Sequence, residues 1–132
     1  MLATGLGALA VCVAIASGLA ISARTQSAAQ PDVKRGVEAF NSGDFRRAVE
    51  YFERAVSLDA NYTNARLHLA NALIRDFIVA GQKGADESAP APLLQRAREQ
   101  FSAVLPYDPK NVAATFGLVA LKAHRGFRNH AS

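Results

Sequence analysis

The chain repeats a short pattern of small and aromatic residues, and this constrains its fold more than any other feature. Ala48 and Phe52 recur 49 residues later as Ala97 and Phe101. Within each pair the two residues are four positions apart, so both side chains lie on one face of a helix. Recurrence of this kind is typical of stacked helical units that bury a shared core. We therefore expect an all-α chain built from repeated helices.

A second interval separates the helices that precede these pairs. Gly36 recurs as Ala70, and Ala39 recurs as Leu73, in each case 34 residues later. Because 49 is 34 plus 15, the second unit must carry about 15 extra residues. The segment 79–92, VAGQKGADESAPAP, is dense in Gly, Pro, Ser and charge, so we expect it to be an inserted loop. Such a loop is either a mobile spacer or a functional element.

Apolar residues follow helical spacing along the chain beyond residue 30. In the segment 45–57 they recur at i, i+3, i+4 and i+7, which forms one apolar stripe along a helix. A third copy of the pattern begins within 113–127, where Val119 lies 49 residues after Ala70. The expected helices cover residues 32–42, 45–57, 62–78, 92–105 and 109–124.

Turn residues separate the expected helices. Gly43 can adopt the left-handed conformation that ends a helix, and Asp44 can cap the next helix through its side chain. Asp108 followed by Pro109 is expected to cap and open the last helix. The small residues expected to let helices approach closely are at positions 36, 48, 55, 70 and 97, and the rings expected to fill the space between them are Phe45, Phe52 and Phe101.

The sequence resembles the tetratricopeptide-repeat family over residues 31–127. The matching motifs are the small residues Gly36 and Ala70, the turn Gly43-Asp44-Phe45, the Ala-x3-Phe pairs at 48–52 and 97–101, and the closing Pro109. The first repeat departs from the family at Asp32 and Ala60, where Trp and Pro are usual. The resemblance implies an α-solenoid of antiparallel helix hairpins, about two and a half repeats long. An N-terminal apolar helix is expected before it, because residues 6–21 are apolar and carry no charge.

This plan divides the chain into an N-terminal segment and a helical repeat domain. The N-terminal segment covers residues 1–29, the helical repeat domain covers 30–127, and a C-terminal tail covers 125–132. Within the domain, hairpin 1 covers residues 31–61 and hairpin 2 covers 62–108, including the inserted loop 79–92. A lone helix covers residues 109–124. The lone helix has no second helix after it. Phe116, Leu118, Val119 and Leu121 are therefore expected to be incompletely covered, which favours self-association or a partner.

The N-terminal segment contains an apolar run, residues 6–21, without a charged side chain. This length is near the upper limit for the apolar region of a secretory signal and slightly short of a membrane span of about 20 residues. Ser27-Ala28-Ala29 fits a small-x-small cleavage pattern, so we expect cleavage after Ala29 and export to the periplasm or cell envelope. No Lys or Arg precedes the run, and the alternative is therefore an uncleaved membrane anchor.

Several classes of function are not indicated. The net charge of +4 is spread along the helices without a basic and aromatic cluster, so nucleic acid is not an expected partner. Cys12 is the only cysteine, which excludes an intramolecular disulfide. His68, His124 and His130 are scattered and predict no metal site. No nucleophile or phosphate-binding motif is present, so we expect no catalytic residue, no cofactor and no enzymatic activity.

The family resemblance implies a concave groove, lined by the first helix of each hairpin, that binds a protein or peptide. If the groove-facing helix positions of the family are applied to this sequence, the groove is lined by Val33, Val37 and Phe40 from the first repeat, Leu67, Asn71, Ile74 and Arg75 from the second, and Phe116, Ala120 and His124 from the third. Most of these side chains are apolar, while Asn71 and Arg75 could bond a peptide backbone or carboxylate. The groove differs from the two-carboxylate clamp of chaperone-binding relatives, because Val33 and Val37 replace the expected Lys and Asn.

The expected function is therefore that of an adaptor or scaffold that binds a peptide or protein partner. Each groove residue could instead simply pack against a neighbouring helix or a second copy of the chain. Two alternatives for the whole chain remain open. The first is a self-assembling or membrane-tethered structural protein that has no separate ligand. The second is an accessory fragment of a longer enzyme.

Overall fold

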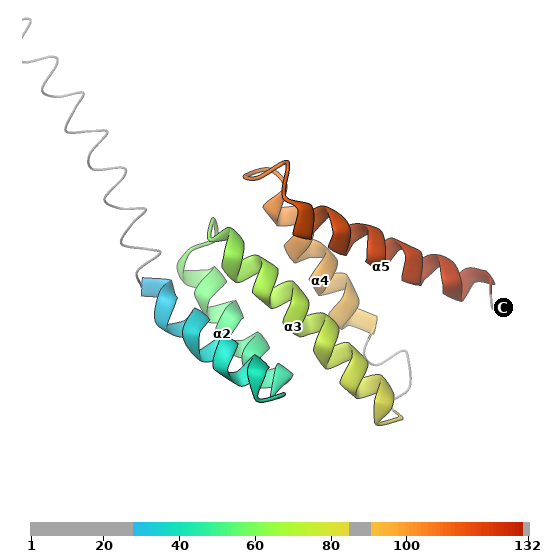
Figure 1. Cartoon of the computed structure of the whole chain (residues 1–132), viewed down its shortest axis with the longest axis horizontal. Helices are drawn as coiled ribbons and strands as arrows, with labels where there is room; N and C mark the ends of the chain where they lie inside the picture. Colours follow the sequence, from blue (N-terminus) through green and yellow to red (C-terminus); the bar gives the residue numbers. More distant parts are fainter. Residues whose placement is uncertain (1–27, 85–90, 131–132) are drawn as a thin grey trace, which may run out of the picture.

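The computed structural model describes residues 28–84 and 91–130, and within these residues the chain forms helices joined by turns. The first described helix covers residues 28–41. It is followed by α2 (Phe45–Leu58), α3 (Thr63–Gln82), α4 (Ala91–Val104) and α5 (Val112–His130). Consecutive helices run in opposite directions, as Figure 1 shows. The expected all-α class is confirmed.

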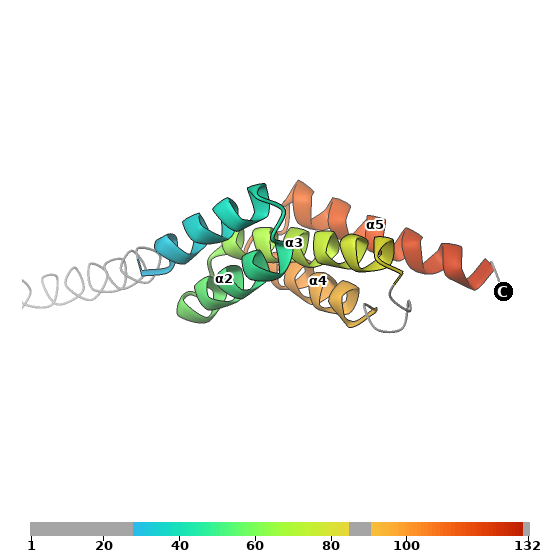
Figure 2. The same ribbon diagram turned by 90° about the horizontal axis from the view of Figure 1, so that it is seen from below.

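The helices lie in two layers. Helix 28–41, α3 and α5 form the nearer layer in Figure 1, with α2 and α4 behind them. Figure 2, turned by 90°, shows α2 and α4 lowest in the view and the other three helices above them. α3 packs against both α2 and α4, and α4 in turn packs against α5. From α2 to α5, each helix therefore contacts mainly its neighbours along the chain, which is the arrangement of a helical repeat.

The core is built where small residues of one helix meet aromatic rings of another. The buried residues of its main cluster include Ala48, Phe52, Leu73, Ala97, Phe101, Val104, Ala114 and Leu121. A Cβ atom added to Gly36 would lie 2.5 Å from Phe52 Cε1, and one added to Gly117 would lie 2.5 Å from Phe101 Cε2. Real Cβ atoms do not come this close to a ring, so the two phenylalanines lie directly on glycine backbone. Positions 48, 55, 70 and 97 are fully buried alanines, as expected.

The turn between helix 28–41 and α2 has the expected conformation. Gly43 has a φ of 82°, and its N–H donates to the Phe40 carbonyl at 3.1 Å. The Asp44 N–H donates to the Ala39 carbonyl at 3.0 Å, so two carbonyls at the end of the first helix are satisfied. Asp44 Oδ1 then accepts from the Arg47 N–H at 3.2 Å and caps α2. Two adjacent residues thus end one helix and begin the next.

Loss of this cap should weaken the fold measurably. Asp44→Ala is expected to lower the free energy of unfolding by about 0.5–2 kcal/mol, because the Arg47 N–H would lose its acceptor. Urea denaturation followed by circular dichroism measures the change. Glu50→Ala is the control, since it removes a carboxylate from the exposed middle of the same helix. Equal midpoints for the two variants would contradict the capping role of Asp44.

The last helix begins later than the sequence suggests. Asp108 and Pro109 do not open it: α5 starts at Val112, and Asn111 Oδ1 accepts from the Ala114 N–H at 2.9 Å. Asp108 instead accepts from Asn111 Nδ2 at 2.8 Å and holds the capping side chain. Asn is as good an N-cap as Asp, and here Asn111 takes the position. The predicted start at residue 109 was wrong for this reason.

The other helix boundaries also differ from the expected ones. α3 continues through Gln82, so residues 79–82 of the expected loop are helical, and Gly84, with a φ of 73°, follows its end. Residues 85–90 of that loop lie outside the described residues. α5 continues to His130, whereas a tail was expected from residue 125. No proline follows residue 124, and the single glycine there does not end the helix.

The first described helix is already formed at residue 28, four residues before its expected start. Ala29 is fully buried in a small cluster with Ala55 and Ala65. Cleavage after Ala29 would remove this residue from the cluster. The apolar run 6–21 and Cys12 lie outside the described residues, so export and anchoring stay predictions. No helix in the described part of the chain is long and apolar enough to span a bilayer.

Candidate functional site

A pocket opens between helix 28–41 and α3, with Phe52 of α2 contributing to its lining. We call it the front pocket. It has a volume of about 430 Å³ and is lined by Val37, Phe40, Asn41, Phe52, His68, Asn71, Ile74 and Arg75. Helix 28–41 and α3 belong to the same layer (Figure 1), and the residues that line the pocket come mainly from these two neighbouring helices.

Two stacked rings form one part of the front pocket. The rings of Phe52 and His68 lie with their centroids 5.2 Å apart and their planes at 13°. Gly36 makes this arrangement possible, because any side chain there would occupy the place of the Phe52 ring. Partial burial lowers the pKa of His68 below its usual value, since desolvation disfavours the charged imidazolium. At neutral pH this part of the pocket therefore presents uncharged aromatic rings.

The other end of the front pocket carries a cation. The Arg75 guanidinium lies over the Phe45 ring, 5.2 Å from its centroid, and Phe45 in turn meets Phe40 edge-on at 5.1 Å. Among the described residues Arg75 takes part in no ion pair. Its charge is thus held over an aromatic ring, and it can donate hydrogen bonds through its N–H groups. Asn41 and Asn71, both exposed, add amide groups that can donate and accept.

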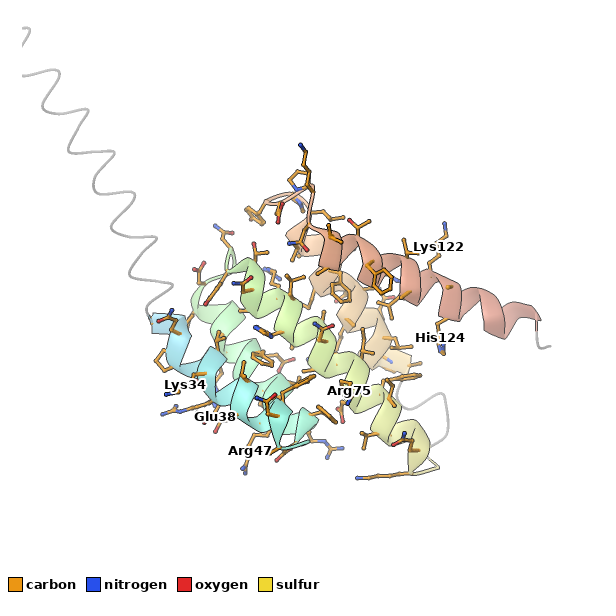
Figure 3. All side chains as sticks on the ribbon, in the orientation of Figure 1. Lys34, Glu38, Arg47, Arg75, Lys122 and His124 are labelled. Atoms are coloured by element: carbon orange, nitrogen blue, oxygen red, sulfur yellow. The ribbon has the colours of Figure 1, made fainter. Side chains whose placement is uncertain are left out.

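Charged side chains lie on both sides of helix 28–41, but the two sides differ. Figure 3 shows Lys34, Glu38 and Arg47 along the edge turned away from α3, whereas Arg75 lies on α3 itself. On the outer edge acids and bases are mixed, and Asp32 pairs with Arg35 and with Arg54, each at 3.9 Å. The front pocket contains a base and no acid. It is therefore suited to a partner that carries a negative charge.

The structure brings together five of the ten predicted groove residues: Val37, Phe40, Asn71, Ile74 and Arg75. The three additional lining residues are Asn41, Phe52 and His68. His68 lies three positions before Asn71 on the same helix face, so helical spacing alone could have indicated it. Phe52 was expected only as a core residue. Its ring is both buried and part of the pocket, and no pattern in the sequence distinguishes these roles.

The other five predicted residues do not line the front pocket. Val33 lines a separate cavity of about 510 Å³ together with Gln30, Pro31, Lys34 and Tyr62. Leu67 packs against the main core cluster, which is the simpler packing role considered for it. Phe116 and Ala120 are exposed on α5.

His124, also on α5, contacts α3. Its ring meets the Phe77 ring of α3 edge-on, with centroids 5.7 Å apart. Figure 3 places His124 and Lys122 along α5, away from Arg75. The groove expected across three helices is therefore represented by a pocket between only two of them, and His124 serves as a contact between α3 and α5.

Within the described residues, no three His, Cys, Asp or Glu side chains gather closely enough to hold a metal ion. Comparison of the sequence with known protein families finds no match, and comparison with curated proteins finds none either. The chemistry of the front pocket is consequently read from its own residues.

Proposed function

We propose that this chain is a tetratricopeptide-like adaptor that binds a peptide or protein partner in the front pocket. The sequence intervals of 34 and 49 residues and the Gly43-Asp44 turn support the repeat assignment. The alternating layers of antiparallel helices agree with it (Figure 2). The main support for a binding role is the front pocket itself, which has aromatic rings in one part and the Arg75 guanidinium at the other end.

The size and lining of the front pocket indicate what it would hold. A volume of about 430 Å³ falls within the range of about 300–1,000 Å³ common for binding pockets. Val37, Phe40 and Ile74, which are half-buried, offer apolar surface to one bulky apolar side chain of a peptide. Asn41 and Asn71 can bond the peptide backbone beside it. Arg75 would pair with a carboxylate, either an acidic side chain or a chain end.

In this proposal the chain performs no catalysis and needs no cofactor, and its N-terminal segment 1–29 directs it to the cell envelope or anchors it there. The binding energy is expected to be concentrated in few residues. Aromatic and arginine side chains dominate most interfaces, and the front pocket combines both types. The partner's apolar side chain would provide most of the buried area, whereas Arg75 would select for acidic sequences.

Arg75→Gln is expected to weaken binding of acidic peptides about 10-fold or more, because hydrogen bonds to a charged group contribute about 1.5–3 kcal/mol each. Peptides are first selected on an array with the wild-type chain, and their dissociation constants are then measured by fluorescence anisotropy. Arg46→Gln is the matched control, since it removes an exposed arginine of α2 outside the pocket.

The variant Asn71→Ala tests the Asn71 amide separately. It should weaken the binding of every captured peptide, whatever the peptide's charge, by a smaller factor than Arg75→Gln weakens the binding of acidic peptides. Loss of about 0.5–1.5 kcal/mol corresponds to roughly 2- to 13-fold. If Arg75→Gln and Asn71→Ala bind every captured peptide as tightly as Arg46→Gln does, the front pocket is not the binding site. Failure of the wild-type chain to capture any peptide would also contradict the proposal.

A further inference from the structure

The outward face of α5 carries the three most exposed large hydrophobic residues of the described helices. Val112, Phe116 and Val119 are 79%, 72% and 61% exposed, and they recur at i, i+4 and i+7. This spacing forms one stripe along the helix. Ala114 and Leu121, which are buried in the main core, lie on the opposite side of α5. α5 therefore has two apolar faces, of which only one is covered by the chain itself.

The uncovered residues differ in part from those expected. Leu121 is only 7% exposed, and Leu118 packs against the main core cluster, so both belong to the covered face. Phe116 and Val119 are uncovered as expected, and Val112 joins them. We call these three residues, Val112, Phe116 and Val119, the α5 stripe.

The internal repeat shows what kind of element covers this face elsewhere. Val119 lies 49 residues after Ala70, which lies 34 residues after Gly36. Gly36 lies directly against Phe52 of α2, the second helix of its hairpin, and Ala70 is fully buried. Phe116 corresponds in the same way to Leu67, which is partly buried against the core. In the first hairpin, therefore, the following antiparallel helix covers a position whose equivalent stays open on α5, and the equivalent position on α3 is buried as well.

α5 also carries the pattern of the covering helices. Each second helix presents Ala, then Phe four positions later, then Ala or Val three positions after that: Ala48, Phe52 and Ala55 in α2, and Ala97, Phe101 and Val104 in α4. Val112, Phe116 and Val119 repeat this spacing. The α5 stripe is thus a surface that another helix would cover, and it also has the residue pattern of the helices that do the covering.

We propose that the α5 stripe is the interface with a second copy of this chain, formed by two α5 helices that pack antiparallel across a two-fold axis. A two-fold axis perpendicular to the helices makes the pair antiparallel, as in a hairpin, and lets the same surface serve both copies. Phe116 of one copy would lie against the small side chains of Ala120 and Ala123 of the other, as Phe52 lies against Gly36. The axis then passes near Val119 and Ala120.

The charge on residues 112–124 of α5 agrees with self-pairing. Between residues 112 and 124 the only basic or acidic side chains are Lys122 and His124. Lys122 lies about a quarter turn away from the α5 stripe on the helix, and His124 is directed to Phe77 of α3. Pairing through the α5 stripe would bury no charge, and the antiparallel direction keeps the two Lys122 side chains apart. The front pocket, between helix 28–41 and α3, is not part of this interface.

Disulfide trapping tests both the interface and its direction. The full-length chain is used in mild detergent with Cys12→Ser, so that an introduced cysteine is the only thiol. Val119→Cys, next to the axis, is expected to cross-link to itself on mild oxidation. Val112→Cys should not, because it lies about seven residues from the axis, which places its two copies roughly 20 Å apart at 1.5 Å per residue. Equal cross-linking of both variants, or none at Val119→Cys, would overturn the proposal.

Sedimentation velocity tests the contribution of Phe116. Phe116→Glu is expected to raise the dimer dissociation constant about 100-fold or more, while the circular dichroism spectrum stays unchanged because the side chain is 72% exposed. Lys122→Glu makes an even larger charge change off the α5 stripe and should leave the dimer intact. The proposal is contradicted if the wild-type chain is monomeric both at high concentration and after 100-fold dilution. It is also contradicted if Phe116→Glu still associates as the wild-type chain does.

Discussion

Phe52→Ala is expected to lower the free energy of unfolding by about 3–5 kcal/mol, the largest effect of any single substitution considered for this chain. The Phe52 side chain is 1% exposed and is the largest of the fully buried ones. It joins three helices, because its ring belongs to α2, lies against Gly36 of helix 28–41 and stacks on His68 of α3. No smaller side chain can fill this space without moving the helices.

Chemical denaturation of the full-length chain, followed by circular dichroism, measures this loss. A domain of about 100 residues has a stability of only about 5–15 kcal/mol, so the variant should be close to unfolding at 37 °C. Tyr107→Ala is the control, since Tyr107 is an aromatic residue that is 60% exposed. Its loss should change the unfolding free energy by less than about 0.5 kcal/mol. Similar losses in the two variants would contradict the packing described for Phe52.

The second large effect is expected at Gly36, where an added methyl group should destabilise the fold by about 1–3 kcal/mol. The new Cβ would lie 2.5 Å from Cε1, 2.7 Å from Cδ1 and 2.9 Å from Cζ of Phe52. Helix propensity alone favours alanine over glycine in a helix by roughly 0.5–1 kcal/mol. The steric effect must therefore exceed this gain, and Gly36→Ala tests whether it does.

Gly81 provides the matched control. It also lies in a helix, α3, and a Cβ added there would meet nothing within 4 Å. Gly81→Ala should consequently raise the unfolding free energy, by up to about 1 kcal/mol, while Gly36→Ala lowers it. Adding Phe52→Leu to Gly36→Ala should recover part of the loss, because the two residues are in contact and their effects are coupled. If both alanine variants are stabilised, the close contact of Gly36 with Phe52 does not limit the fold.

Local signals in the sequence predicted the local structure well. The Gly43-Asp44 turn depends on one residue that tolerates a positive φ and one that can cap, and both properties are intrinsic to the residues. The same reasoning failed at Pro109. Two candidate caps, Asp108 and Asn111, lie three positions apart there, and propensity does not decide between them.

The rotation of α5 about its axis could not be read from the repeat alone. The repeat aligns Val119 with the small residue Ala70, but Gly117 is the residue that meets the Phe101 ring, while Val119 is 61% exposed. In a solenoid each first helix touches two second helices, one before it and one after it. Gly117 faces the preceding helix, α4, whereas Val119 faces the side on which the described chain provides no helix.

The candidate site was predicted in part for a similar reason. Helical phase identified Asn71, Ile74 and Arg75, because these lie on one face of a single helix. It did not identify the role of Phe52, whose ring reaches the front pocket only because Gly36 lets α2 approach helix 28–41 closely. Whether a side chain of the second layer reaches the pocket depends on how the helices pack against each other. The spacing of residues within one helix does not specify this packing.

Chemical-shift mapping of a bound peptide would test the central proposal most directly. The full-length chain, labelled with ¹⁵N, is titrated with an acidic peptide selected on the array, and amide and side-chain signals are followed. Binding in the front pocket predicts that the largest changes occur at Val37, at the Asn71 side-chain amide and at the Arg75 guanidinium. Largest changes along the α5 stripe, or shifts unaffected by Arg75→Gln, would place the peptide elsewhere and contradict the proposed function.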